Sequence, residues 1–178
     1  FQHISDNMLK AMKRQHNKTS SMKLIEEFRN KIPNIALRTT LLTGFPGETD
    51  RDYEELLNFV RQVEFDRLGV FTYSHEENTY AGERLKDNIP QKIKEERAAY
   101  IMEIQEEISL KKNKEKIGKS IKVIVDNFNG EHYYGRTEFD SVEVDNDVIF
   151  TSETPLQPGN FINVKINEAG SFELFGKA

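Results

Sequence analysis

The sequence predicts an α/β unit with parallel strands, followed by a small all-β barrel of the OB-like kind. Three observations predict this fold class. Strand-type and helix-type segments alternate between residues 35 and 116, an order that favours parallel pairing of the strands. After residue 118 the pattern changes to short strands separated by turn residues. The 178 residues are 37% hydrophobic and 31% charged, which suits one ordinary domain and a smaller second one.

The N-terminal segments predict two helices and a strand. Residues 6–16 carry apolar side chains at helical spacing, and Ser5 before them is a good N-cap. A second helix is expected from Ser20, or the residue after it, to Lys31. Residues 35–43 are apolar and β-branched without clean alternation, as expected of a strand that is covered on both faces.

A turn after this strand leads into a helix, a second strand and a loop. Thr49, with Asp52 three residues further on, resembles a capping box, and the apolar positions up to Val63 predict an amphipathic helix. Residues 68–73 predict a short buried strand. The polar segment 74–88 that follows is as long as loops that have a function tend to be.

The end of the α/β unit and the start of the barrel are marked by Gly118. A long helix is expected from Pro90 to the lysine-rich segment before this glycine. Beyond it, turns such as Asn129-Gly130 separate about five short strands, which must close on themselves to bury a core. We therefore expect two domains, residues 1–117 and 118–178.

The composition excludes several classes of protein. The sequence has no cysteine, so these residues can form no disulfide, thiol nucleophile or cysteine-ligated metal site. No apolar run is long enough to span a bilayer, and no segment reads as a signal peptide. A cytoplasmic location and no membrane partner are therefore expected. Because Phe1 cannot be a native start, we expect the sequence to begin inside a longer chain.

The net charge of -5 lies entirely in the last third of the sequence. Residues 1–117 hold 20 basic and 20 acidic side chains, whereas residues 118–178 hold 5 basic against 10 acidic ones. An acidic module repels phosphate backbones and attracts basic surfaces. The charge of this region therefore favours a basic protein over a nucleic acid as its partner.

Polar residues follow three successive strand-type segments. They are Gln2 and His3, the glycine-bounded turn at 44–48, and residues 71–77. In parallel α/β folds ligands bind at the carboxyl ends of the strands, so we expect these groups to converge on one pocket. Each also has a simpler explanation, namely helix capping, an ordinary strand-to-helix turn and a solvated loop. No paired carboxylates, metal-ligand spacing or phosphate loop indicates a reaction.

Five motifs occur together in a characteristic order and spacing. They are Gln-His-Ile-Ser-Asp at 2–6, Met-Lys-Arg at 12–14, Arg-Thr-Thr at 38–40, Gly-Phe-Pro-Gly-Glu-Thr at 44–49 and Phe-Asp-Arg-Leu-Gly-Val-Phe-Thr-Tyr-Ser at 65–74. This set resembles the radical S-adenosylmethionine methylthiotransferases. The Asp-Arg-Leu-Gly-Val-Phe run, with the later Gly-Arg-Thr and Glu-Val-Asp triplets at 135–137 and 143–145, resembles the RimO branch. That branch methylthiolates an aspartate of a small-subunit ribosomal protein.

The resemblance covers essentially the whole sequence and implies an architecture. It implies the C-terminal half of a radical S-adenosylmethionine (β/α) barrel, followed by a TRAM domain. The family uses S-adenosylmethionine and two 4Fe–4S clusters, whose cysteine ligands would lie outside this sequence. The resemblance therefore implies that these residues ligate no metal, that the catalytic residues are unknown, and that this part is inactive alone.

The resemblance also implies a set of residues that contact S-adenosylmethionine. They come from the three polar groups at the strand ends and from the start of the first strand. The set is Gln2, His3, Arg38, Gly44, Phe45, Pro46, Gly47, Glu48, Phe71, Thr72 and Tyr73. Gly44 and Gly47 are expected to leave space where the cofactor approaches the backbone.

The acidic tail is expected to dock the substrate, a basic ribosomal protein. We expect most of its aromatic side chains to fill the barrel core, and a smaller set to contact the substrate. The expected docking residues are Tyr133, Tyr134, Arg136, Glu143, Asp145 and Asp147. Two alternatives stay open. One is an enzyme that modifies an adenosine of transfer RNA, the less expected partner, and the other is a noncatalytic acidic binding module.

Overall fold

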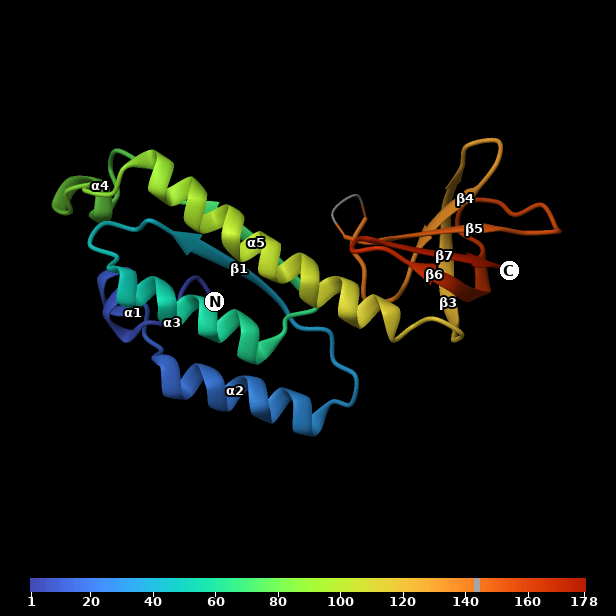
Figure 1. The fold of residues 1–178 in the computed structure, drawn as a ribbon, viewed down its shortest axis with the longest axis horizontal. Coiled ribbons are helices and arrows are strands. Elements are labelled where there is room, and N and C mark those ends of the chain that lie inside the picture. Colours follow the sequence, from blue (N-terminus) through green and yellow to red (C-terminus); the bar gives the residue numbers. More distant parts are fainter. Residues whose placement is uncertain (143–144) are drawn as a thin grey trace. The chain divides into compact units, whose positions relative to one another are not determined.

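The computed structural model describes residues 1–142 and 145–178 (Figure 1). These residues form two compact units, residues 1–105 and 106–178, which are described separately below. The division falls inside a long helix rather than at its end. The domain limits expected from the sequence, 1–117 and 118–178, stay a prediction.

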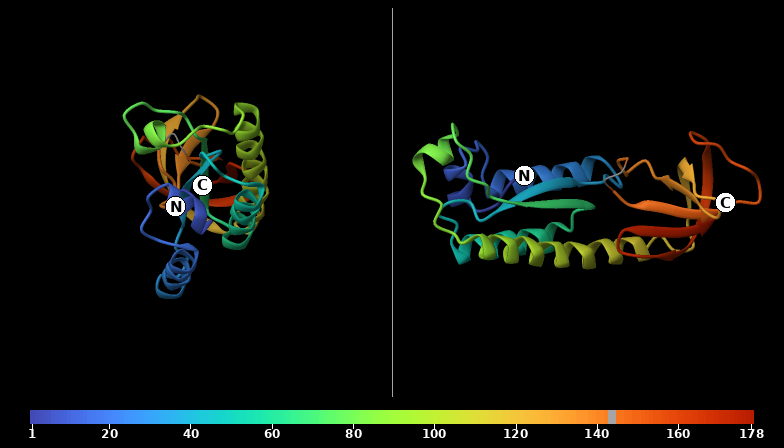
Figure 2. Two further views of the ribbon diagram at one scale, coloured as in Figure 1. Left: turned by 90° about the vertical axis from the view of Figure 1, so that its left-hand side faces the viewer. Right: turned by 90° about the horizontal axis from the view of Figure 1, so that it is seen from above.

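The first unit is a two-stranded parallel sheet with helices, as the alternating pattern predicts. Its elements are α1 (Asp6–Ala11), α2 (Lys18–Lys31), β1 (Arg38–Thr43), α3 (Asp50–Val63), β2 (Arg67–Thr72), α4 (Tyr80–Arg84) and the first part of α5 (Gln91–Lys114). The strands β1 and β2 lie side by side (Figure 2), with Arg38 opposite Arg67 and Thr43 opposite Thr72. The helix α3 has the expected capping box, in which Thr49 and Asp52 hydrogen-bond to each other's backbone N–H.

The limits of several elements differ from the prediction; the first strand, for example, begins at Arg38 rather than at residue 35. The first helix ends at Ala11 rather than residue 16, because Lys13 has a left-handed backbone with φ 58°. The second helix begins earlier than Ser20, because Asn17 is its N-cap and Ser20 completes a capping box as the third helical residue. The segment expected to be a loop over 74–88 contains the short helix α4.

The sheet of the first unit is covered on one face only, which corrects the expectation of a strand buried on both faces. Along β1, Thr39, Leu41 and Thr43 are buried while Arg38 and Thr40 are exposed. The buried face belongs to a core that includes most of the apolar face of α3. In the described residues the opposite face of the sheet is open.

The second unit is a closed five-stranded barrel, which confirms the expected fold class. Its strands are β3 (Ser120–Phe128), β4 (Tyr133–Arg136), β5 (Asp147–Thr151), β6 (Phe161–Ala169) and β7 (Glu173–Lys177), in the order β3-β4-β5-β7-β6. The buried core consists of Val123, Val125, Tyr133, Val148, Phe150, Val164, Ile166 and Leu174. The last turns of α5 join this unit, because Asn113 Nδ2 donates a hydrogen bond to the carbonyl of Gly170 at 3.0 Å.

The aromatic side chains of the barrel lie mostly outside its core, contrary to the expectation from the sequence. Five phenylalanines are exposed: Phe128, Phe139, Phe161, Phe172 and Phe175. The core is filled largely by valine, isoleucine and leucine, which are β-branched or compact enough to pack inside a narrow barrel. The exposed rings are therefore available for contacts with other molecules. Among the residues described, no helix has the length and apolar character needed to cross a membrane.

Candidate functional site

The carboxyl ends of three neighbouring segments meet in the first unit. The backbone of Gln2 lies beside β1, since its carbonyl accepts a hydrogen bond from Leu42 N–H at 2.8 Å. As a result His3 lies next to the turn that follows β1, and its Nε2 is 3.2 Å from Glu48 Oε1. From the end of β2, Tyr73 contacts Phe45 in the same turn, with ring centres 5.3 Å apart. The structure thus brings together one residue from each of the three predicted groups.

The tautomer of His3 follows from its hydrogen bonds. Its Nδ1 lies 2.9 Å from Ile4 N and 3.0 Å from Ser5 N, and both of these backbone N–H groups donate to it. A nitrogen that accepts carries no proton, so the proton of the neutral ring is on Nε2. His3 therefore donates this proton to Glu48, and its other nitrogen accepts the two backbone N–H groups just before α1.

Glu48 is the centre of a buried hydrogen-bond network. Its second oxygen accepts a hydrogen bond from Gly44 N–H at 2.9 Å and another from the Arg97 guanidinium. Arg97 also donates to Asp50 Oδ1 at 2.6 Å. The carboxylate of Glu48 is thus satisfied within the protein and fixes the shape of the turn 44–48. We call His3, Gly44, Glu48 and Arg97 the turn network.

Two residues of α5 that support this turn were missed by sequence reasoning. They are Arg97 and Lys94, which lie about fifty positions after the turn in a helix rich in charged residues. Lys94 is buried, and its ammonium donates to Asp87 Oδ2 at 2.6 Å and to the Tyr73 carbonyl at 3.3 Å. No local motif distinguishes these cations from the solvated ones beside them, because only the tertiary fold buries them.

The two glycines of the turn have different surroundings. A Cβ built on Gly44 would lie 2.2 Å from Cγ of Lys94, so this lysine fills the space beside Gly44. Gly44 was expected to leave room for a cofactor, but the space next to its α-carbon is occupied by Lys94. A Cβ on Gly47 would meet nothing within 4 Å, so its surroundings are open. Both glycines have positive φ angles, 72° and 87°, which explains the residue type at both positions.

Next to the turn network lies a small apolar cluster with one unsatisfied polar group. Met8, Phe45 and Tyr73 are its buried members, and Pro46 beside them is also buried. In the described residues the buried hydroxyl of Tyr73 has no hydrogen-bond partner. Burial raises the pKa of this hydroxyl, and the nearby carboxylates of Asp87 and Glu76 raise it further. An unpaired buried hydroxyl is costly, and it suits a ligand atom that accepts a hydrogen bond.

The open face of the sheet holds a second set of predicted residues. Gln2 and Arg38 line one pocket of about 490 Å³, together with Arg14 and Thr40. On β2 the ring of Phe71 is 67% exposed and is in register with Leu42, so both lie on this face. Thr72 is half-buried and points to the other face. The predicted cofactor residues are therefore divided between this open face, the turn network and the apolar cluster.

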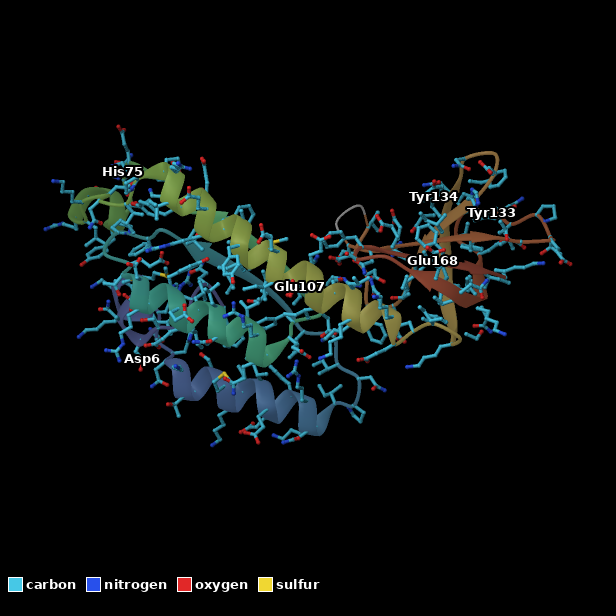
Figure 3. All side chains as sticks on the ribbon, viewed as in Figure 1. Asp6, His75, Glu107, Tyr133, Tyr134 and Glu168 are labelled. Atoms are coloured by element: carbon cyan, nitrogen blue, oxygen red, sulfur yellow. The ribbon has the colours of Figure 1, made fainter. Side chains whose placement is uncertain are left out.

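The predicted docking residues of the barrel do not form one surface. Tyr133 and Tyr134 are neighbours on β4 (Figure 3), and because alternate strand residues face opposite ways, Tyr133 points into the core. It is 8% exposed and stacks on Phe150 at 5.6 Å, so the expectation of a docking role for its ring is wrong. Tyr134 and Arg136 are half-buried and lie on the outer side.

The acidic docking residues lie near further carboxylates. Asp147 is exposed at the start of β5, opposite Glu173 of β7, and Asp145 is half-buried. Glu143 lies outside the described residues. Partial burial raises the pKa of Asp147, and the negative charges of Asp126, Glu173 and Asp140 raise it further. Within the described residues, no group of three or more histidine, cysteine, aspartate or glutamate side chains is arranged to hold a metal ion.

Comparison with known protein families gives two matches, one at each end of the chain. Residues 1–60 match the radical SAM superfamily and residues 117–178 match the TRAM domain. The first third of the chain thus resembles a radical S-adenosylmethionine domain, and the last third resembles a TRAM domain.

Comparison with individual proteins gives a more specific result than the two domain matches. Proteins named ribosomal protein uS12 methylthiotransferase RimO, from Parabacteroides distasonis, Bacteroides thetaiotaomicron and Prosthecochloris aestuarii, are 49%, 51% and 51% identical to the chain. Each alignment covers 99% of this chain and 41% of the relative. The chain is thus similar to these proteins along nearly its whole length, and it spans about two fifths of theirs.

Proposed function

We propose that the chain is the C-terminal part of an enzyme that adds a methylthio group to an aspartate of ribosomal protein uS12. The observation that carries this proposal is the identity of about 50% to the RimO proteins along 99% of the chain. An identity this high along nearly the whole chain supports the same reaction for the protein to which the chain belongs. We propose a cytoplasmic location on the same ground.

The radical SAM match implies S-adenosylmethionine and iron–sulfur chemistry in the family. When bound, S-adenosylmethionine supplies the radical that activates the carbon to be modified. The chain has no cysteine, so we propose that both clusters are held by residues outside this sequence. This part of the protein would then contribute to binding the cofactor and the substrate, and would be inactive alone.

The residues present fit S-adenosylmethionine at the carboxyl ends of β1 and β2. The Tyr73 hydroxyl lacks a partner in the described residues, and the exposed ring of Phe71 offers a surface for the adenine. Arg38, at the start of β1, lines a pocket with Gln2 on the same open face, and a guanidinium there is a good partner for the carboxylate of the methionine part. The turn network would hold Phe45 and Gly47 in place at the carboxyl end of β1.

Within the site, each group of the chain has a definable task. The turn network holds Gly44 to Glu48 rigid through charge-assisted hydrogen bonds, and its buried members keep water away from the turn. The neutral His3 ring keeps its Nε2 proton on the side of Glu48, so it positions the turn rather than transferring a proton. The open sheet face is left for the reactants.

The activity is tested in a chimaera. The N-terminal part of the Bacteroides thetaiotaomicron relative, up to the matched region, is joined to this chain and loaded with clusters under anaerobic conditions. We expect mass spectrometry to show a methylthio group on an aspartate of uS12 and none on bulk transfer RNA. Modified transfer RNA with unmodified uS12 would support the alternative enzyme, and modification of neither substrate would reject the activity.

The cofactor site is tested separately by S-adenosylmethionine binding to the same chimaera. Arg38→Gln should weaken binding about tenfold, as expected when one charge-assisted hydrogen bond is lost. The matched control is Arg51→Gln on α3, an exposed arginine that lies 3.8 Å from Glu55. Equal affinities for wild type and Arg38→Gln would remove Arg38 from the site.

A further inference from the structure

The pocket on the open face of the sheet in the first unit is rich in positive charge. It has a volume of about 490 Å³, and its lining includes Gln2, Arg14, His16, Arg38 and Thr40. Two of these side chains are permanent cations, and a histidine can become one. No aspartate or glutamate is among the described residues that line the pocket. A pocket of this size and charge is suited to a small anionic group.

The position of Arg14 follows from the way in which α1 ends. Lys13 has a left-handed backbone, with φ 58°, and its N–H donates to the Lys10 carbonyl at 3.1 Å. The N–H of Arg14 donates to the Leu9 carbonyl at 2.8 Å. These two hydrogen bonds form a Schellman motif, which ends the helix and fixes the backbone of Arg14. The Arg14 guanidinium donates to Oε1 of Gln2, whose backbone lies beside β1, so Arg14 is held at the pocket.

The chain itself does not neutralise the charge of Arg14. In the described part of the chain, the Arg14 side chain has a single hydrogen-bond partner, and this is an uncharged amide oxygen. No carboxylate of these residues lies within ion-pair distance of it. Arg97, in contrast, is paired with the carboxylates of Glu48 and Asp50. A guanidinium has five N–H donors, so Arg14 retains donors and a full charge for a ligand.

The reaction proposed above brings two carboxylates to this face of the sheet. One belongs to the methionine part of S-adenosylmethionine, for which Arg38 is the proposed partner. The other is the side chain of the aspartate that receives the methylthio group. Arg14 and Arg38 come from different segments but line the same pocket, so each guanidinium can bind one carboxylate through two parallel hydrogen bonds.

We propose that Arg14 binds the side-chain carboxylate of the aspartate to be modified and thereby selects aspartate over asparagine. The side chain of aspartate has a single methylene group, which is bonded directly to the carboxylate. Holding the carboxylate therefore also fixes the position of the neighbouring carbon. Asparagine would offer Arg14 an uncharged amide, and the charge-assisted pair would be lost. This inference rests on the proposed function and adds to it a residue that recognises the substrate.

The test is peptide binding to the cluster-loaded chimaera, which requires no turnover. Overlapping fluorescein-labelled peptides of uS12 are made with each aspartate present and again with asparagine in its place, and binding is followed by fluorescence anisotropy. Wild type should bind one aspartate peptide about tenfold more tightly than its asparagine counterpart. Arg14→Gln should bind the two peptides equally, and Arg14→Lys should recover part of the preference. The matched control is Arg51→Gln on α3, which should keep the full preference.

S-adenosylmethionine binding separates this role of Arg14 from a role in holding the cofactor. Arg14→Gln should bind S-adenosylmethionine as wild type does, and thermal unfolding should show that the variant is folded, since Arg14 is exposed. The proposal is overturned if no uS12 peptide shows an aspartate preference in wild type or if the preference persists in Arg14→Gln. It is also overturned if Arg14→Gln weakens S-adenosylmethionine binding as much as Arg38→Gln does.

The activity assay of the chimaera distinguishes failure of this inference from failure of the proposed function. Methylthiolation of uS12, together with an unchanged aspartate preference in Arg14→Gln, would reject the role of Arg14 and leave the proposed function intact. Methylthiolation of transfer RNA instead of uS12 would reject the proposed function, whatever the peptides show.

Discussion

At the scale of single residues, Glu48 has the most interactions in the turn that follows β1. Its two oxygens accept hydrogen bonds from His3, Gly44 and Arg97 while it is buried. Glu48→Gln removes the charge that Arg97 requires, and breaking a buried ion pair from one side costs about 3 kcal/mol. Urea denaturation of the 178-residue chain should show this loss in the free energy of unfolding.

An exposed glutamate serves as the control for this prediction. Glu55→Gln breaks the ion pair with Lys18, whose charged atoms are 3.3 Å apart on the surface. Such pairs contribute less than about 1 kcal/mol. Equal losses in both variants would contradict the central role of Glu48 in the turn network.

The lowered pKa of the Asp52 carboxyl predicts that the stability of the chain depends on pH. Burial by itself raises the pKa of its carboxyl, but hydrogen bonds from Ser5, Thr49 and Asn7 outweigh burial and hold the pKa below 3.8. A lowered folded-state pKa stabilises the protein above the unfolded-state value and stops doing so as the pH falls through the folded-state value. Asp52→Asn should therefore cost about 1 kcal/mol at neutral pH and progressively less below pH 3.8.

The measurement is urea denaturation of wild type and Asp52→Asn over a series of pH values. A difference between the two proteins that stays constant as the pH falls below 3.8 would show that the charge of Asp52 is not what stabilises the start of α3. Glu54→Gln is the control on the same helix, because the Glu54 side chain is exposed.

At the scale of elements, the turn between β1 and α3 should respond differently at its two glycines. Both have positive φ angles, so alanine at either position costs about 1 kcal/mol of backbone strain. At Gly44 the new Cβ must also displace Lys94, whose Cγ would be 2.2 Å away. Gly44→Ala should thus lose about 2 kcal/mol more than Gly47→Ala in urea denaturation. The reverse order would show that Lys94 moves aside easily.

The elements themselves were largely predictable because their signals are local. The capping box of Thr49 and Asp52, the helix break at Gly118 and the Asn129-Gly130 turn act through neighbours in sequence. The sequence-based predictions were wrong or incomplete where the burial of a side chain depends on contacts between residues far apart in the sequence. Burial of Lys94 and Arg97 depends on a turn fifty residues away, and the open face of β1 depends on what packs against the sheet.

At the scale of the whole molecule, the total charge and the number of aromatic residues did not predict which side chains lie on which surface. The barrel region has twice as many acidic as basic residues, yet Lys122 and Lys165 both lie on the outer sides of the neighbouring strands β3 and β6. Its phenylalanines were expected in the core, whereas five are exposed. Composition averages over faces, and only the strand register shows which face each side chain occupies.

Negative charge is concentrated around Asp147. This predicts that the Asp147 carboxylate lowers the stability of the folded chain while it favours binding of a basic partner. Burial and the neighbouring carboxylates of Asp126, Glu173 and Asp140 raise the pKa of Asp147 above 3.8. A raised folded-state pKa means that the ionised carboxylate destabilises the native state at neutral pH, and that this cost disappears below 3.8. Asp147→Asn should therefore stabilise the chain by up to about 0.5 kcal/mol at neutral pH and have no effect at lower pH.

The presence of a destabilising negative charge at Asp147 is explained if this carboxylate binds a basic partner. Asp147→Asn should then bind a lysine-rich peptide more weakly than wild type while it unfolds at a higher temperature. Glu131→Gln, a change at an exposed turn, is the control for both measurements. A variant that is more stable and binds the peptide as well as wild type would show that the acidic side of the barrel does not dock the substrate. Docking would then have to be sought at the exposed phenylalanines.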